Sequence, residues 1–170
     1  MRGKKGREHF DAADPPRCRA NKRRGRGTFA NDRPPVVGTI GRETGQVRLR
    51  VTKNTKQVTL RQHVEQFTDQ GAHIYTDEYD SYNTIQRQRS TVAHGQKEWA
   101  RDDDGDGIRE VHTNTIEGLW TGLRNFLRPF RGVSKHFLSG YVAIHEFCVN
   151  LKQVSVFLVS TLVRAHLFYP

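Results

Sequence analysis

Cysteine is scarce in this sequence, which has two among its 170 residues. Cys18 and Cys148 lie far apart and form no Cys-x-x-Cys pair, so neither a disulfide framework nor a structural zinc site is expected. We therefore expect the protein to work in a reducing compartment, the cytoplasm. The N-terminal stretch at residues 1–16 is basic and lacks an apolar core, so it does not have the pattern of a secretory signal.

Long hydrophobic runs are also lacking. The longest, VSVFLVSTLV at residues 154–163, is too short to cross a bilayer and is expected to form a buried helix or strand. Hydrophobic residues make up 35% of the chain, and the mean hydropathy is −0.75. Because the second half still contains dense apolar runs, we expect one folded domain with a core of its own.

Negative charge is in short supply, since 28 Lys and Arg face 18 Asp and Glu and the net charge is +10. This excess favours a polyanionic partner, nucleic acid first. Residues 1–33 carry most of it, with eleven basic and four acidic residues. We predict an exposed arm that contacts DNA phosphates; a solvated tail that only keeps the protein soluble is the simpler alternative. The expected contacts are Arg17, Arg19, Lys22, Arg23, Arg24 and Arg26.

The character of the chain changes after the arm, and residues 34–170 are predicted to form the folded domain. Alternating β-branched residues around a Glu-Thr-Gly turn predict a β-hairpin over residues 36–51. An apolar stripe predicts a helix over residues 60–71. A short strand is predicted at residues 73–76, and a second helix over residues 77–89.

Helical periodicity returns at residue 114 and is interrupted at Pro129 and Gly132. The apolar stripe consists of Ile116, Leu119, Trp120, Leu123, Phe126, Leu127 and Phe130. A further helix is predicted from Ser134, and a third apolar segment over residues 154–168 closes the chain. A helix that is apolar on one side and basic on the other suits a DNA-facing surface. The basic residues expected there are Arg124, Arg128, Arg131 and Lys135.

The acidic run DDDGDG at residues 102–107 invites a comparison with calcium-binding loops. Asp102, Asp104, Asp106 and Gly107 match positions 1, 3, 5 and 6 of an EF-hand loop, but Thr113 stands where the loop needs its final Glu. Arg109 replaces the usual apolar residue, and no pair of helices flanks the run. We therefore expect an acidic turn rather than a calcium site.

Two carboxylates can be interpreted either as helix-capping residues or as metal ligands. Asp77 follows a predicted strand, where it could cap a helix, and Glu117 has capping-box spacing from Asn114. Alternatively, a strand-end Asp and a helix-borne Glu are ligands of the kind that a two-metal phosphoryl-transfer site uses. Such a site needs at least three acids and hard cations such as Mg²⁺ or Mn²⁺.

Three stretches of the chain carry a family resemblance. They are residues 34–51 (PPVVGTIGRETGQVRLRV), residues 74–82 (IYTDEYDSY) and residues 111–150, which include His-Thr-Asn-x-x-Glu-Gly and a later Val-Ser-Lys-His. They resemble the catalytic domain of DDE insertion-sequence transposases of the ISXO-like family, from about residue 14 to the C-terminus. The resemblance implies a ribonuclease-H-like α/β fold, with a mixed sheet flanked by helices.

The resemblance also implies a site and an activity. Asp77 matches the second acid and Glu117 the third; His112 and Asn114 support the site, and Asn114 could be a ligand in place of Glu117 or beside it. Two Mg²⁺ or Mn²⁺ ions are expected in an intact site. Intact members hydrolyse phosphodiesters at transposon ends and direct the freed 3′-OH at target DNA. DNA and further copies of the chain are the expected partners, and no membrane is involved.

The chain departs from the family at the first acid, which should lie on a central strand ahead of the basic arm. Asp11 and Asp14 are the nearby acids of this type, and no β-branched run surrounds them. We therefore expect an N-terminally truncated and inactive copy that lacks the first strand. A non-catalytic DNA-binding remnant that competes with an intact transposase is one alternative, and a ribonuclease-H-like nuclease of other purpose is another.

Overall fold

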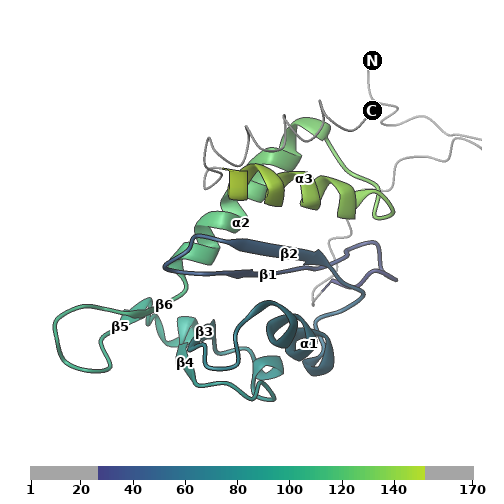
Figure 1. Cartoon of the computed structure of the whole chain (residues 1–170). Helices are drawn as coiled ribbons and strands as arrows, with labels where there is room; N and C mark the ends of the chain where they lie inside the picture. The colour runs from purple at the N-terminus through teal and green to yellow at the C-terminus, as the bar shows by residue number, and fades with distance from the viewer. Residues whose placement is uncertain (1–26, 152–170) are drawn as a thin grey trace, which may run out of the picture.

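A computed structural model describes residues 27–151, and Figure 1 shows how their helices and strands are arranged. The strands are β1 (Val36–Ile40), β2 (Val47–Val51), β3 (Ile74–Asp77), β4 (Arg89–Val92), β5 (Ala100–Arg101) and β6 (Val111–His112). The helices are α1 (Gln57–Phe67), α2 (Asn114–Leu127) and α3 (Leu138–Leu151), and short 3₁₀ helices are η1 (Asp80–Tyr82), η2 (His94–Gln96) and η3 (Arg128–Phe130). The α/β class is confirmed. The arm residues up to Arg26, with Asp11 and Asp14, and the apolar segment 154–168 lie outside the described residues.

The predicted hairpin is confirmed. Strands β1 and β2 pair antiparallel, with Val36 opposite Val51 and Ile40 opposite Val47. Gly45 completes the turn with a φ of 64°, a conformation that glycine adopts without steric cost. Figure 1 shows the hairpin between two layers of helix, with α2 and α3 on one side and α1 on the other.

Helix α1 lies earlier in the chain than predicted. It begins at Gln57, because the side chain of Asn54 accepts hydrogen bonds from the Lys56 N–H (3.0 Å) and the Thr59 hydroxyl (2.9 Å). It ends at Phe67 rather than at Gly71, since Thr68 is extended and its hydroxyl donates to the Val64 carbonyl at 2.6 Å. A side chain that competes for a helix carbonyl in this way favours termination.

The predicted helix over residues 77–89 is wrong. After β3 the chain makes only the short η1, and residues 89–92 then form β4, which runs parallel to β3 with Asp77 opposite Val92. Asp, Ser, Asn and Thr are frequent after β3, and their side chains favour turns over helix. Strand β4 gains its stability from pairing with β3, a long-range interaction that local periodicity does not report.

Helix α2 confirms the predicted apolar stripe as far as Leu127, with Leu119 and Leu123 buried, whereas Phe130 lies beyond the helix in η3 and is exposed. Its N-cap is Thr113, which makes Asn114 the first helical residue, so the capping box predicted between Asn114 and Glu117 is wrong. Trp120 packs so closely on β1 that a Cβ on Gly38 would lie 2.7 Å from its ring.

Helix α3 begins at Leu138, four residues later than the predicted start at Ser134. Residues 134–137 form a separate turn instead, in which the Phe137 N–H donates to the Ser134 carbonyl at 3.0 Å.

Helix α3 covers the outer edge of β2 with side chains. The amide of Asn150 accepts the Val47 N–H at 2.8 Å and donates to the Val47 carbonyl at 2.9 Å. The carboxylate of Glu146 accepts the Leu49 N–H at 2.5 Å. Because Val47 is fully buried, these bonds satisfy backbone groups that water cannot reach.

We predict that Asn150→Ala lowers the free energy of unfolding by about 1–3 kcal/mol, because it leaves the buried backbone of Val47 without partners. Urea unfolding followed by circular dichroism measures this change. The matched control is Asn125→Ala at an exposed position on α2, which should change stability by less than about 0.5 kcal/mol. Equal effects of the two substitutions would contradict the edge-capping role.

His63 on α1 is buried, and neither ring nitrogen has a hydrogen-bond partner among the described residues. Burial, and then the positive charge of Arg50, lower the pKa of His63 to about 4. Between pH 6.5 and 4, His63 therefore binds a proton in the unfolded chain but not in the folded chain. Stability rises with pH across this window and is lost as the pH falls through it.

We predict that His63→Leu removes up to about 3 kcal/mol of the acid-induced loss of stability between pH 7 and 4. The measurement is the urea midpoint of both proteins across this pH range. Gln62→Leu, at an exposed position of the same helix, removes no titratable group, serves as the control and should leave the pH dependence unchanged. An unaltered acid slope in His63→Leu would show that other groups cause it.

Candidate functional site

A cavity of about 1510 Å³ lies between the hairpin and the β3–β4 pair. All of β1 and all of β3 line it, α1 contributes Leu60 and Val64, and α2 contributes Glu117 and Trp120. Within residues 27–151, β1 pairs with β2 alone and β3 with β4 alone, so the two strand pairs do not join. The sequence-predicted residues Asp77, His112 and Glu117 all line this cavity.

Asp77 is the last residue of β3, half-buried at the cavity wall. Its Oδ1 accepts the Tyr79 N–H at 3.2 Å, and the hydroxyl of Tyr79 donates to the Thr55 carbonyl at 3.1 Å. The loop after β3 is thereby tied to the segment before α1. Oδ2 of Asp77 has no hydrogen-bond partner in the described part of the chain, which leaves it available to a ligand.

Glu117 lies in the first turns of α2, and its side chain is 53% exposed. Its Oε1 accepts the Thr113 hydroxyl at 3.2 Å and lies 3.2 Å from His94 Nε2. Thr113 and His94 also contact each other, with Oγ1 and Nε2 at 3.0 Å. One oxygen of the carboxylate is therefore held from two sides, and nothing in residues 27–151 bonds to the other.

Glu78 connects the end of β3 to His94. Its carboxylate accepts the N–H of His94 at 3.0 Å and the N–H of Gly95 at 2.8 Å. Hydrogen bonds from its own N–H and from Gly95 lower the pKa of Glu78. The chain neighbour of Asp77 thus positions the histidine that touches Glu117. Sequence reasoning missed both residues: His94 lies in a polar segment without periodicity, and the one available signal was that Glu78 adjoins Asp77.

Arg42 ties the hairpin to this end of the cavity. Its guanidinium lies 3.6 Å over the ring of Tyr75 and donates to the carbonyls of Glu110 and His112, the latter at 2.6 Å. Burial, and then the charge of Arg42, lower the pKa of His112. Asn114, the other predicted supporting residue, is exposed and does not line the cavity.

The two carboxylates suit a hard cation such as Mg²⁺, but they are fewer than the three acids that a two-ion site needs. Among the described residues, the one group of three potential ligands with atoms within 4.8 Å of one another is elsewhere, at Asp102, Asp104 and Asp106. In residues 27–151 the acids that line the cavity are Glu43, Asp69, Asp77 and Glu117, and no three of them bring ligand atoms within 4.8 Å of one another.

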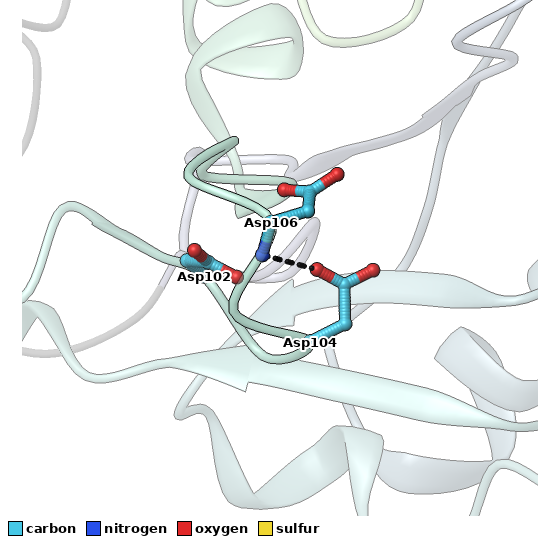
Figure 2. Close-up of side chains that lie close together, drawn as sticks. All are labelled: Asp102, Asp104 and Asp106. Atoms are coloured by element: carbon cyan, nitrogen blue, oxygen red, sulfur yellow. Dashed lines mark hydrogen bonds between the residues drawn. The ribbon is translucent and has the colours of Figure 1, made fainter.

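The group at residues 102–106 is shown in Figure 2, on the loop between β5 and β6. Its carboxylates accept backbone N–H groups of the loop itself: Asp102 binds those of Gly105 (2.6 Å) and Gly107 (2.9 Å), and Asp104 that of Asp106 (3.2 Å). The loop joins two strands rather than two helices, in line with the predicted acidic turn. These backbone contacts hold the tight turns of the loop.

The four basic residues predicted to face DNA on α2 and after it differ in their surroundings. Arg124, Arg128 and Arg131 are exposed. Lys135 is bound instead: its ammonium lies 2.8 Å from Asp32 Oδ1 and donates to the Phe29 carbonyl at 3.2 Å. Residues 27–33, which the sequence analysis assigns to the arm, therefore pack on the body of the domain.

A family model described as the ISXO2-like transposase domain matches residues 7–150. The match covers most of the chain and agrees with the resemblance drawn from the hairpin, the strand-end Asp and the His-Thr-Asn-x-x-Glu-Gly motif. The chain belongs to the ISXO2-like transposase domain family.

A curated relative comes from an insertion element. It is described as an uncharacterized protein in transposable element ISH50 of Halobacterium salinarum and is 33% identical over 144 residues. The matched region covers 82% of this chain and 46% of the relative, so the chain spans about half the length of that protein. No solved structure matches the chain. Across residues 27–151, no helix is long and apolar enough to span a membrane.

Proposed function

We propose that this chain is the catalytic domain of a DDE transposase, which in complete form hydrolyses phosphodiesters at transposon ends and joins the freed 3′-OH to target DNA. The observation that carries the proposal is that Asp77 and Glu117, distant in sequence, line one cavity together with His112. Membership of the ISXO2-like family supports it. The protein acts in the cytoplasm on DNA, as a homo-oligomer in its complete form.

The proposed fold is ribonuclease-H-like. An antiparallel hairpin, a parallel strand pair and helices on both sides are parts of such a mixed sheet. In this proposal the first strand, which carries the first acid, belongs between β1 and β3 and is not among the described residues. The same proposal divides the chain into a DNA-binding arm at residues 1–33 and a catalytic domain at residues 34–170.

Asp77 and Glu117 are the proposed ligands of Mg²⁺ or Mn²⁺, with His112 and Asn114 in support. Bound divalent ions supply charge neutralisation for the attacking and leaving oxygens of the phosphodiester. The chain's own contribution is orientation: Thr113 and His94 hold one oxygen of Glu117, and the Tyr79 N–H holds one oxygen of Asp77. In each carboxylate the second oxygen remains for an ion.

Helix α2 offers a path for DNA away from the carboxylates. Arg124 and Arg128 follow Glu117 at spacings of seven and eleven residues, which places all three on one face of an α-helix. With a rise of about 1.5 Å per residue, the two arginines lie roughly 10 and 16 Å along the axis from Glu117. A DNA strand whose scissile phosphate lies beside Glu117 would therefore also pass Arg124 and Arg128, which can bind its phosphates.

A non-catalytic role is the second candidate, and one observation favours it. The acids Glu43, Asp69, Asp77 and Glu117 line the cavity, but within residues 27–151 no three of them bring ligand atoms within 4.8 Å of one another, and removing one carboxylate from a two-ion site normally disables it. A chain with the basic arm and the α2 arginines could still occupy DNA and compete with an intact transposase.

We predict that replacing Arg124 and Arg128 together by Ala weakens binding to random duplex DNA and reduces the log–log salt slope by roughly 0.9 for each lost phosphate contact. Affinity measured from low to physiological salt reports both values. Lys53→Ala, at an exposed position after β2, is the control and should change neither. Deleting residues 1–26 tests the arm in the same assay while leaving Phe29 and Asp32 to bind Lys135. An unchanged slope in the double variant would rule out the α2 path.

The 170-residue chain by itself is predicted to show no Mg²⁺- or Mn²⁺-dependent cleavage or strand transfer, because two acids do not complete a two-ion site. Adding a family first strand with its Asp upstream should create activity on transposon-end DNA. Asp77→Asn in the extended protein should abolish that activity. Cleavage by the short chain that disappears in Asp77→Asn would contradict the need for another strand and point to a third ligand within the chain.

A further inference from the structure

An exposed tryptophan lies next to the residues that hold Glu117. Trp99 is 60% exposed, whereas the other tryptophan of the chain, Trp120, packs on β1 close to Gly38. Single apolar side chains are common on protein surfaces, so exposure alone says little. What distinguishes Trp99 is the place where its ring is held.

The ring of Trp99 lies on the ring of His94. The two ring centroids are 5.1 Å apart, and the ring planes are tilted by 39°. On the same imidazole, Nε2 lies 3.2 Å from Glu117 Oε1. One histidine ring therefore touches both the exposed indole and a carboxylate of the candidate site.

The strand pairing supports this placement. The register of β5 with β6, continued by one residue, puts Trp99 opposite Thr113. The Thr113 hydroxyl contacts His94 at 3.0 Å and Glu117 at 3.2 Å. Figure 1 shows β5 and β6 at the end of the domain where α2 begins. Since His94 lines the cavity and Trp99 does not, the indole lies at the rim of the cavity.

The turn that carries Trp99 is held by Glu98. The N–H of Glu98 donates to the Ala93 carbonyl at 3.2 Å, and the Glu98 carboxylate accepts the Ala93 N–H at 2.9 Å. The same carboxylate accepts Arg101 Nη1 at 3.0 and 3.1 Å. The residues on both sides of Trp99 are thus fixed, so little conformational freedom is lost when a ligand covers its ring.

The charges around Trp99 favour a neutral ligand group over a phosphate. The guanidinium of Arg101 is already paired, with Glu98 and with Asp103 at 2.5 Å. The acidic loop at residues 102–106 follows and repels phosphates. A nucleic-acid base stacks on an aromatic ring through its uncharged face, so these surroundings suit a base.

We infer that Trp99 is a stacking site for an unpaired DNA base, at the nucleotide next to the phosphodiester that reacts. Inside a duplex both faces of a base are covered by its neighbours, so the bound base is terminal or turned out of the helix. The stacking site stands on the exposed indole and its surroundings. Its position beside the reacting phosphodiester rests on the proposed function, through the contact between His94 and Glu117.

Fluorescence of 2-aminopurine tests the stacking without any cleavage. The probe is a short DNA duplex with one unpaired 2-aminopurine at a 3′ end, mixed with the 170-residue chain, EDTA and excess unlabelled blunt duplex. Stacking on the indole should quench the emission, and the overhang should strengthen binding about tenfold relative to the blunt probe. Trp99→Leu should lose both effects, whereas Trp99→Phe, which keeps an aromatic face, should retain most of them.

Ile108→Ala is the matched control, because Ile108 is an apolar residue that is 65% exposed on the loop after β5. It should change neither the quenching nor the preference for the overhang. Salt dependence separates stacking from phosphate contacts: Trp99→Leu should leave the log–log salt slope unchanged, whereas the double substitution of Arg124 and Arg128 should reduce it.

Two results would overturn the stacking site. One is an equal preference for the overhang in the wild-type chain and in Trp99→Leu. The other is equal binding of the wild-type chain to an overhang with a base and to one with an abasic nucleotide.

Cleavage by the chain extended with a family first strand separates this inference from the proposed function. There Trp99→Leu should lower kcat/KM on transposon-end DNA about tenfold. Cleavage that is indifferent to Trp99→Leu would refute the position beside the reacting phosphodiester and leave the proposed function in force. Quenching by the 170-residue chain without cleavage by the extended one would contradict the proposed function and leave the stacking site in force.

Discussion

Open backbone edges are the constraint on which the rest of this structure depends. A buried N–H or C=O group must find a partner, and the chain meets that requirement at β2 with two side chains of α3. On the edges of β1 and β3 that are not paired with β2 and β4, the described residues provide no such partners, and the cavity separates the β1–β2 pair from the β3–β4 pair. Asp77 at the end of β3 and Glu117 on α2 line the same cavity.

The polar contacts around this gap orient the carboxylates from several elements at once. Glu117 is held by Thr113 and by His94, and Glu78 holds His94 in turn through the backbone of η2. Arg42 fixes β6 to the hairpin by its bonds to the His112 and Glu110 carbonyls. Side chains from the hairpin turn, from η2 and from the ends of β3 and β6 therefore line the same cavity.

Much of this arrangement can be predicted from sequence where the signal is local. Alternation around a turn predicts the hairpin, and an apolar stripe predicts α2. Strand β4 has no such signal, because its pairing with distant β3 decides its conformation. The role of His94 could not be predicted either, because it lies in a polar segment without periodicity and the sequence does not show that Glu78 binds its backbone N–H. Asp77 and Glu117 are identified from a motif, and their common cavity comes from the tertiary structure.

Paramagnetic relaxation by Mn²⁺ tests most directly whether Asp77 and Glu117 act as one cation site. The measurement is the NMR line broadening of backbone amides during a Mn²⁺ titration of the chain extended upstream by a family first strand with its Asp. We expect the amides of Asp77 and Glu117 to broaden together, and at lower Mn²⁺ than the loop at residues 102–106. Broadening confined to that loop, with Asp77 and Glu117 unaffected, would contradict the assignment of the site.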